Sequence, residues 1–134
     1  MREVYQGSCH CGAVRFEIET DIVELTTCDC SLCRKKNALM TKVHETEFRL
    51  LSGDDKLKEY QWNMRIARHF FCSECGIYTF HRKRSGPEYY GINVMCLDGF
   101  DPSTVPVRPA EGKTMTLTSD ADPRWPGPRE GSSI

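Results

Sequence analysis

The chain has 134 residues and a formal net charge of -1, and eight of its residues are cysteines. This length fits one domain that buries roughly two thirds of its unfolded surface. The charge argues against nucleic acid held by bulk electrostatics, which requires a strongly basic face. No run of about 18 apolar residues occurs, so no membrane-spanning helix is expected.

The first residues lack the apolar core of a secretory signal peptide, so we expect a protein of the reducing cytoplasm. Disulfides are rare in that compartment, and eight cysteines therefore need another explanation. Their even number leaves a disulfide framework open as an alternative. However, bridges between cysteines two or three residues apart close very small, strained loops. The spacings therefore favour metal binding.

The first cysteine pair, Cys9 and Cys11, precedes a segment with alternating apolar and polar residues at 13–19. That alternation predicts a half-buried strand. If the backbone is extended at the pair, both thiols project to the same side. Gly12 follows the pair and permits a tight bend of the chain around a metal ion.

The densest group of cysteines contains Cys28, Cys30 and Cys33, spaced as C-x-C-x-x-C and followed by three cations at 34–36. Such a turn can direct three sulfurs at one point, which suits one face of a tetrahedral metal ion. The turn supplies no fourth sulfur. A metal bound there would keep one coordination position open. We expect the function of the protein to depend on that position.

Further β-forming segments and one short helical turn at 34–37 are expected along the chain. The β-forming segments are 23–27, 39–44, 48–51, 57–62, 66–71, 77–81 and 89–94. Cys72 and Cys75 fall between two of these segments and would form a metal knuckle between strands. The prediction is a single, mainly β domain with many short antiparallel strands.

Prolines accumulate from Asp101 onward, and no periodicity remains after Thr118. We expect the domain to span residues 1–125, with Trp125 available to anchor its end on the body. Residues 126–134 are expected to form a flexible tail.

The two outer pairs supply four sulfurs, the number that a closed structural zinc site requires. The alternative for the triplet is that a fourth protein ligand closes it as well. Cys96 fits better as a buried small hydrophobic residue, and His69 fits better as a core histidine. The candidate fourth ligands are Cys96, His44, His69, His81 and Asp29.

The cations after the triplet would lie beside the open position. Arg34 and Lys35 are therefore candidate substrate-binding residues, because arginine grips a carboxylate through a two-pronged fork. The alternative is an ordinary solvated turn. A thiol bound at an open zinc position would lose its proton and become a nucleophile for an aldehyde carbon.

Three motifs taken together resemble the glutathione-dependent formaldehyde-activating enzyme family, to which centromere protein V is related. They are C-H-C-G at 9–12, C-x-C-x-x-C-R at 28–34 and R-x-F-F-C-x-x-C-G at 68–76. The resemblance covers residues from Gly7 to about Asp98. It implies a mainly β zinc-binding fold called the β-tent. It also implies the activity of S-(hydroxymethyl)glutathione synthase, a carbon–sulfur lyase, with glutathione as the thiol.

The resemblance further implies two zinc roles. The structural zinc would be bound by Cys9, Cys11, Cys72 and Cys75, and the catalytic, more labile zinc by Cys28, Cys30 and Cys33. A carrier of the thiol adduct is also compatible with this plan. The alternative from another class is a non-catalytic interaction module with both metal sites structural. The sequence indicates no nucleic-acid or membrane partner and no particular oligomeric state.

Overall fold

The computed structural model describes residues 2–28, 31–61, 67–83, 86 and 88–110. These residues form a mainly β domain, as the sequence predicts. The expected anchor at Trp125 and the boundary with a tail at 126–134 lie outside the described residues. The strands are β1 Glu3–Ser8, β2 Arg15–Thr20, β3 Leu25–Cys28, β4 Met40–His44, β5 Phe48–Ser52, β6 Leu57–Tyr60, β7 Arg68–Cys72, β8 Tyr78–Arg82, β9 Tyr89–Asn93 and β10 Val107–Ala110.

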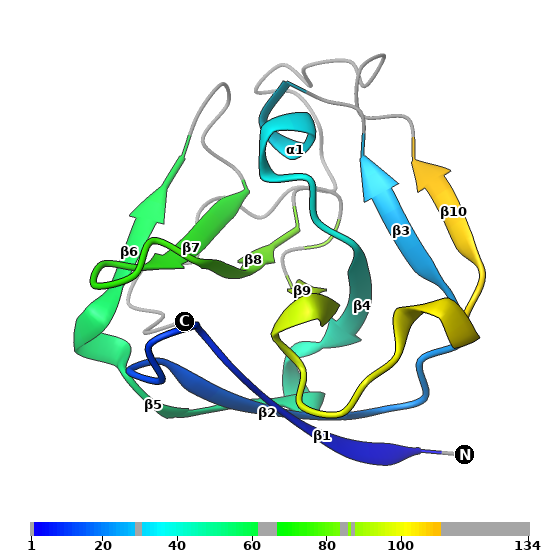
Figure 1. Ribbon diagram of the computed structural model, residues 1–134, viewed down its shortest axis with the longest axis horizontal. Helices are drawn as coiled ribbons and strands as arrows, with labels where there is room; N and C mark the ends of the chain where they lie inside the picture. The colour runs from blue at the N-terminus through cyan, green and yellow to red at the C-terminus, as the bar shows by residue number, and fades with distance from the viewer. Residues whose placement is uncertain (1, 29–30, 62–66, 84–85, 87, 111–134) are drawn as a thin grey trace.

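The strands form two sheets. The smaller has the order β1-β2-β5 and the larger the order β10-β3-β4-β9-β8-β7-β6. In Figure 1 the smaller sheet lies along the bottom of the molecule, and the larger sheet rises above it on both sides of the helix α1, Ser31–Lys36. None of the helices in the described part of the chain is long and apolar enough to cross a membrane.

The expectation of antiparallel strands is confirmed for the described strand pairs except one. β10 runs parallel to β3, with Val107 opposite Leu25 and Ala110 opposite Cys28. The sequence pattern does not predict this strand, because prolines at 106 and 109 interrupt the β-forming residues. A proline fits there because β10 lies at the edge of the sheet, where a missing backbone N–H costs little.

An aromatic core joins the two sheets. The predicted strand at 13–19 is observed as β2, and it buries Phe16 completely. Phe48 of the small sheet stacks on Tyr90 of the large sheet with ring centroids 4.4 Å apart, and it meets Phe80 edge-on at 4.7 Å. Burial of such rings dominates core energetics, so this cluster holds the sheets together.

The segments predicted at 48–51 and 57–62 contain the strands β5 and β6, which belong to different sheets. β5 pairs with β2, whereas β6 pairs with β7. The chain changes sheet at Gly53, whose φ of 90° lies in the left-handed region. A Cβ there would approach the Cα of Val14 to 2.7 Å, so only glycine fits without displacement of the backbone.

Candidate metal centre and its surroundings

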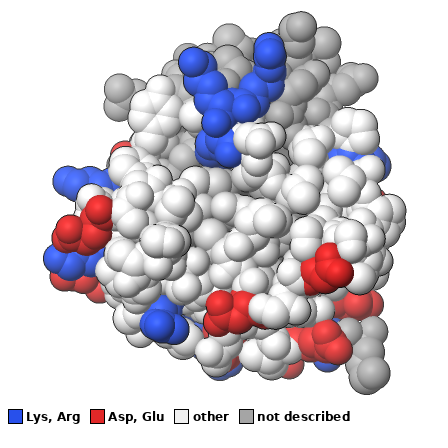
Figure 2. Space-filling model, in the orientation of Figure 1, with Lys and Arg blue, Asp and Glu red and all other residues white. Residues whose placement is uncertain are grey.

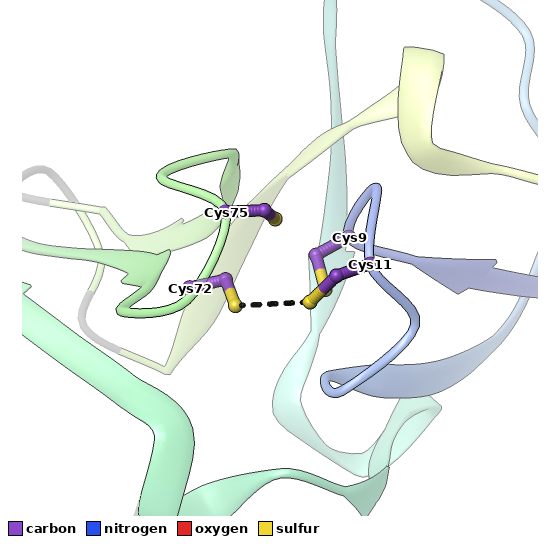
Figure 3. Close-up of side chains that lie close together, drawn as sticks. All are labelled: Cys9, Cys11, Cys72 and Cys75. Carbon is purple, nitrogen blue, oxygen red and sulfur yellow. Dashed lines mark hydrogen bonds between the residues drawn. The ribbon is translucent and has the colours of Figure 1, made fainter.

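Two distant turns bring four thiols together. Cys9 and Cys11 come from the loop between β1 and β2, and Cys72 and Cys75 come from the turn between β7 and β8 (Figure 3). All four sulfurs lie within 4.8 Å of one another, with Cys9–Cys11 at 3.6 Å and Cys11–Cys72 at 3.7 Å. Metal–sulfur bonds near 2.3 Å in a tetrahedron require sulfur–sulfur edges of about 3.8 Å. The cluster could therefore hold a tetrahedral metal ion.

The backbone around each pair has the form of a tight turn. The Gly12 N–H donates to the Cys9 carbonyl at 3.3 Å, so the backbone of the first pair forms a turn and the condition of an extended backbone is not met. Gly12 and Gly76 follow the second cysteine of each pair with φ of 81° and 77°. Glycine adopts these left-handed values at low cost, and the chain can therefore curl until both thiols of a pair face one centre.

Backbone N–H groups point at these sulfurs. The Val14 N–H donates to Cys9 Sγ, and the Glu74 N–H donates to Cys72 Sγ, each at 3.3 Å. Burial raises the pKa of the Cys75 thiol, but hydrogen bonds from the Cys11 and Ile77 backbone and from neighbouring thiols outweigh it and lower that pKa to about 6. Such donors stabilise sulfur as thiolate, the form that binds metal ions.

The triplet is described only in part. Cys28 ends β3 and Cys33 lies half-buried in α1, so the strand and the helix carry the two ends of the motif. Cys30 and the side chain of Cys28 lie outside the described residues, as does Asp29. The predicted helical turn at 34–37 overlaps α1, but the helix begins earlier, at Ser31, and ends at Lys36, since Asn37 has a left-handed φ of 51°.

Two of the candidate fourth ligands have other local partners. His44 caps the short helix Glu45–Glu47, where its ring accepts a hydrogen bond from the Thr46 N–H at 3.2 Å. The Cys96 thiol donates to the Tyr78 carbonyl at 3.6 Å, and burial raises its pKa to about 11.

The other two candidates, His69 and His81, are buried and belong to a polar group that we call the Lys36 cluster: Lys36, His69, Tyr78 and His81. The Lys36 ammonium donates to His69 Nδ1 at 3.0 Å and lies 3.7 Å from the centre of the Tyr78 ring. The Tyr78 hydroxyl and His81 Nδ1 share a hydrogen bond at 2.5 Å. The two imidazoles stack at 5.0 Å. His69 therefore contacts α1 through its Nδ1, and His81 contacts Tyr78 through its Nδ1. The faces of the two rings contact each other.

Burial keeps this cluster's rings neutral. Burial, and next the Lys36 charge, lower the pKa of His69 to about 3 and that of His81 well below its usual value. Burial also raises the pKa of Tyr78 well above 10, with further contributions from Cys33 and Cys96. This cluster was not predicted from the sequence. A usable signal was that His69 and His81 lie in the strands that flank the second cysteine pair.

The three cations of α1 point in two directions. Arg34 and Lys35 are exposed, whereas Lys36 is half-buried in its cluster. Figure 2 shows Lys and Arg side chains gathered at the top of the visible face, where Figure 1 places α1. The two predicted substrate-binding cations are therefore available at the surface next to Cys33.

Comparison with known proteins agrees with this geometry. The family model described as glutathione-dependent formaldehyde-activating enzyme matches residues 4–111, which contain all the cysteine motifs. A crystal structure of a Rhodobacter sphaeroides protein is similar over 77% of this chain and 99% of its own, with a TM-score of 0.72 and 42% sequence identity. The family match extends beyond the Gly7–Asp98 span of the motif resemblance, and it includes β10. The chain belongs to the glutathione-dependent formaldehyde-activating enzyme family.

Proposed function

We propose that the protein is a zinc-dependent enzyme or carrier that acts on a small thiol adduct, with the hydroxymethyl adduct of glutathione as the first candidate. The observation that carries this proposal is the division of the cysteines. Cys9, Cys11, Cys72 and Cys75 converge on one closed centre. The triplet of Cys28, Cys30 and Cys33 remains for a second, open one.

In this proposal the closed centre has a structural role. A zinc ion held by four thiolates has no position for a substrate. It would link the β1–β2 loop to the β7–β8 turn. Cys11 of the loop and Cys72 of the turn are 61 residues apart in the sequence. A compartment as reducing as the cytoplasm would keep all these cysteines as thiols.

The triplet would hold the second zinc through Cys28, Cys30 and Cys33. When bound, that zinc would act as a Lewis acid that lowers the pKa of a substrate thiol. The carbon–sulfur bond forms when the thiolate adds to the aldehyde carbon, and the carbonyl electron pair moves to oxygen, which takes up a proton. Cleavage of the same bond is the lyase direction. The exposed Arg34 and Lys35 would orient the carboxylates of the tripeptide.

Calorimetric titration of the zinc-loaded protein with glutathione, with and without formaldehyde, tests this function. S-methylglutathione is the matched control because its sulfur cannot become a thiolate. We expect the free thiol to bind more tightly than the blocked one. Equal binding of the two would show that sulfur does not contact the metal. If neither binds at millimolar concentration, glutathione is not the substrate.

Two variants connect binding to the proposed residues. Cys30→Ser should abolish glutathione binding while the four-thiol centre stays folded. Arg34→Ala should weaken binding by about 1–3 kcal/mol, the range for charge-assisted hydrogen bonds. The exposed Arg49 pairs with Glu17 in the smaller sheet, whereas β3 and its Cys28 belong to the larger sheet. Arg49→Ala is therefore a control that removes an equal charge.

A further inference from the structure

Both cysteine turns of the four-thiol centre lie against one segment that carries no cysteine. This segment, residues 53–57, contains the short helix Asp54–Lys56 and links β5 to β6 (Figure 1). We call it the connector. The N–H groups of Lys56 and Leu57 both donate to the Gly53 carbonyl, at 2.9 and 3.1 Å, so the two ends of the connector are hydrogen-bonded to each other.

Gly53, at one end of the connector, lies against the first cysteine turn. A Cβ at position 53 would come within 2.7 Å of the Val14 Cα and still closer to the Ala13 carbonyl oxygen. The peptide unit between Ala13 and Val14 is therefore in contact with Gly53. The N–H of this peptide donates to Cys9 Sγ at 3.3 Å. The connector thus touches a peptide whose N–H is directed at a ligand sulfur.

The other end of the connector lies against the second cysteine turn. The Ser73 N–H donates to the Lys56 carbonyl at 2.8 Å, and the Lys56 ammonium lies 3.2 Å from the Glu74 carboxylate. Ser73 and Glu74 separate Cys72 from Cys75, and the Glu74 N–H donates to Cys72 Sγ at 3.3 Å. The connector therefore contacts both residues that form the peptide of this second donor.

Apolar packing adds a third contact between the connector and the metal centre. Leu57 lies opposite Cys72 in the β6–β7 pair, and it packs against the buried cluster of Cys9, Val14 and Cys72. One ligand from each turn belongs to this cluster. Because the apolar shell of a metal site controls the access of solvent, Leu57 helps to shield both turns from water.

We propose that Gly53 is a positioning residue of the four-thiol centre, because the connector that begins at Gly53 fixes the N–H donors of both cysteine turns. This inference rests on the proposed function in one respect, namely that the four thiols hold zinc. Hydrogen bonds from N–H groups to sulfur favour the thiolate, and groups that orient metal ligands contribute to metal affinity. The connector supplies no ligand, so it acts only through the positions of other residues.

The test uses Gly53→Ala, whose Cβ displaces the connector from the peptide at 13–14. Gly91→Ala is the matched control, because a Cβ at 91 also meets occupied space, but its nearest neighbours all belong to His81 of β8. The full-length parent and both variants carry Cys30→Ser, which removes a ligand of the triplet. Each protein is titrated with Co²⁺ against a competing chelator, at a temperature at which circular dichroism shows it folded. The sulfur-to-cobalt charge-transfer band then reports the four-thiol centre.

We expect Gly53→Ala to raise the Kd for the metal by about 10- to 100-fold, the range for groups that support metal ligands. Its charge-transfer band should also differ from that of the parent, because the N–H donors to sulfur have moved. Gly91→Ala should change the Kd by about twofold or less and retain the band of the parent, since it shares no contact with the connector.

A second variant lengthens the connector without any change at position 53. Insertion of one glycine between Asp54 and Asp55 is suitable, because both residues are exposed and such turns tolerate insertion. It separates the end that contacts the first turn from the end that contacts the second. This variant should also raise the Kd, and it makes the comparison if Gly53→Ala does not fold.

Equal Kd values and equal bands for Gly53→Ala and Gly91→Ala would overturn the inference while the four-thiol centre stays in place. An unchanged Kd for the insertion variant would overturn it as well. A parent protein that binds no metal through the four thiols would overturn both the inference and the closed centre of the proposed function. The two failures are therefore distinguishable.

Discussion

Gly91 lies directly against the imidazole of His81, its cross-strand partner between β8 and β9. A Cβ at position 91 would come within 2.9 Å of His81 Nδ1 and still closer to Cε1. The absence of a side chain at 91 therefore makes room for the ring that is hydrogen-bonded to the Tyr78 hydroxyl and stacks on His69.

Gly91→Ala is expected to lower the free energy of unfolding by about 1–3 kcal/mol, because an added methyl group overpacks the site and displaces His81. Urea unfolding measures this change. The double variant with His81→Ala should be less destabilised than the sum of the two single variants, since the smaller residue vacates the space. Additive effects in this cycle would contradict the proposed clash.

Cys72→Ser is expected to destabilise the fold by several kcal/mol and to lose the zinc of the four-thiol centre, because a structural metal contributes directly to folding. Thermal unfolding and the metal content of the purified protein measure the two effects. Cys96→Ser is the control, since Cys96 is half-buried but lies outside the four-thiol cluster. A Cys72→Ser protein that melts like the wild type and retains this zinc would refute the structural assignment.

His69 should make stability depend on pH. Its pKa is lowered from 6.5 to about 3 in the folded chain, so below pH 6.5 the unfolded chain takes up a proton that the folded chain does not. This contribution to stability is complete above pH 6.5 and is lost as the pH falls from 6.5 toward 3. The loss approaches about 1.4 kcal/mol per pH unit.

His69→Phe removes this group and keeps an aromatic ring. Its unfolding free energy, measured by urea denaturation between pH 7 and pH 5, should fall less steeply than that of the wild type. The difference between the two proteins isolates His69 from the protonation of the cysteines, which both share. Parallel curves would show that His69 is not held neutral by the fold.

The metal proposed for the triplet should leave before the metal of the four-thiol centre. Three thiolates hold zinc less firmly than four, and an open position admits solvent and chelators. A mild chelator is therefore expected to remove one zinc while circular dichroism and the melting temperature remain close to those of the loaded protein. Release of both metals at the same rate would indicate that a fourth ligand closes the triplet.

Local features of the fold follow from the sequence because they depend on residues close together in the chain. Alternation at 13–19 predicted β2, since side chains of a strand point to opposite faces. The C-x-x-C spacing at Cys72 predicted a turn between two strands, and β7 and β8 flank it. The family could also be predicted from the sequence, because the order and spacing of the three cysteine motifs are visible there.

The tertiary structure decided which distant parts meet. Only the packing of two sheets brings Cys11 to within 3.7 Å of Cys72, and only the pairing with β3 turns a proline-rich segment into β10. Lys36 is the clearest case: in the sequence it is one of three adjacent cations, yet the fold directs it inward to His69 and leaves Lys35 in water. Spacing along a chain determines local conformation, whereas the environment of a side chain depends on residues that only the completed fold places beside it.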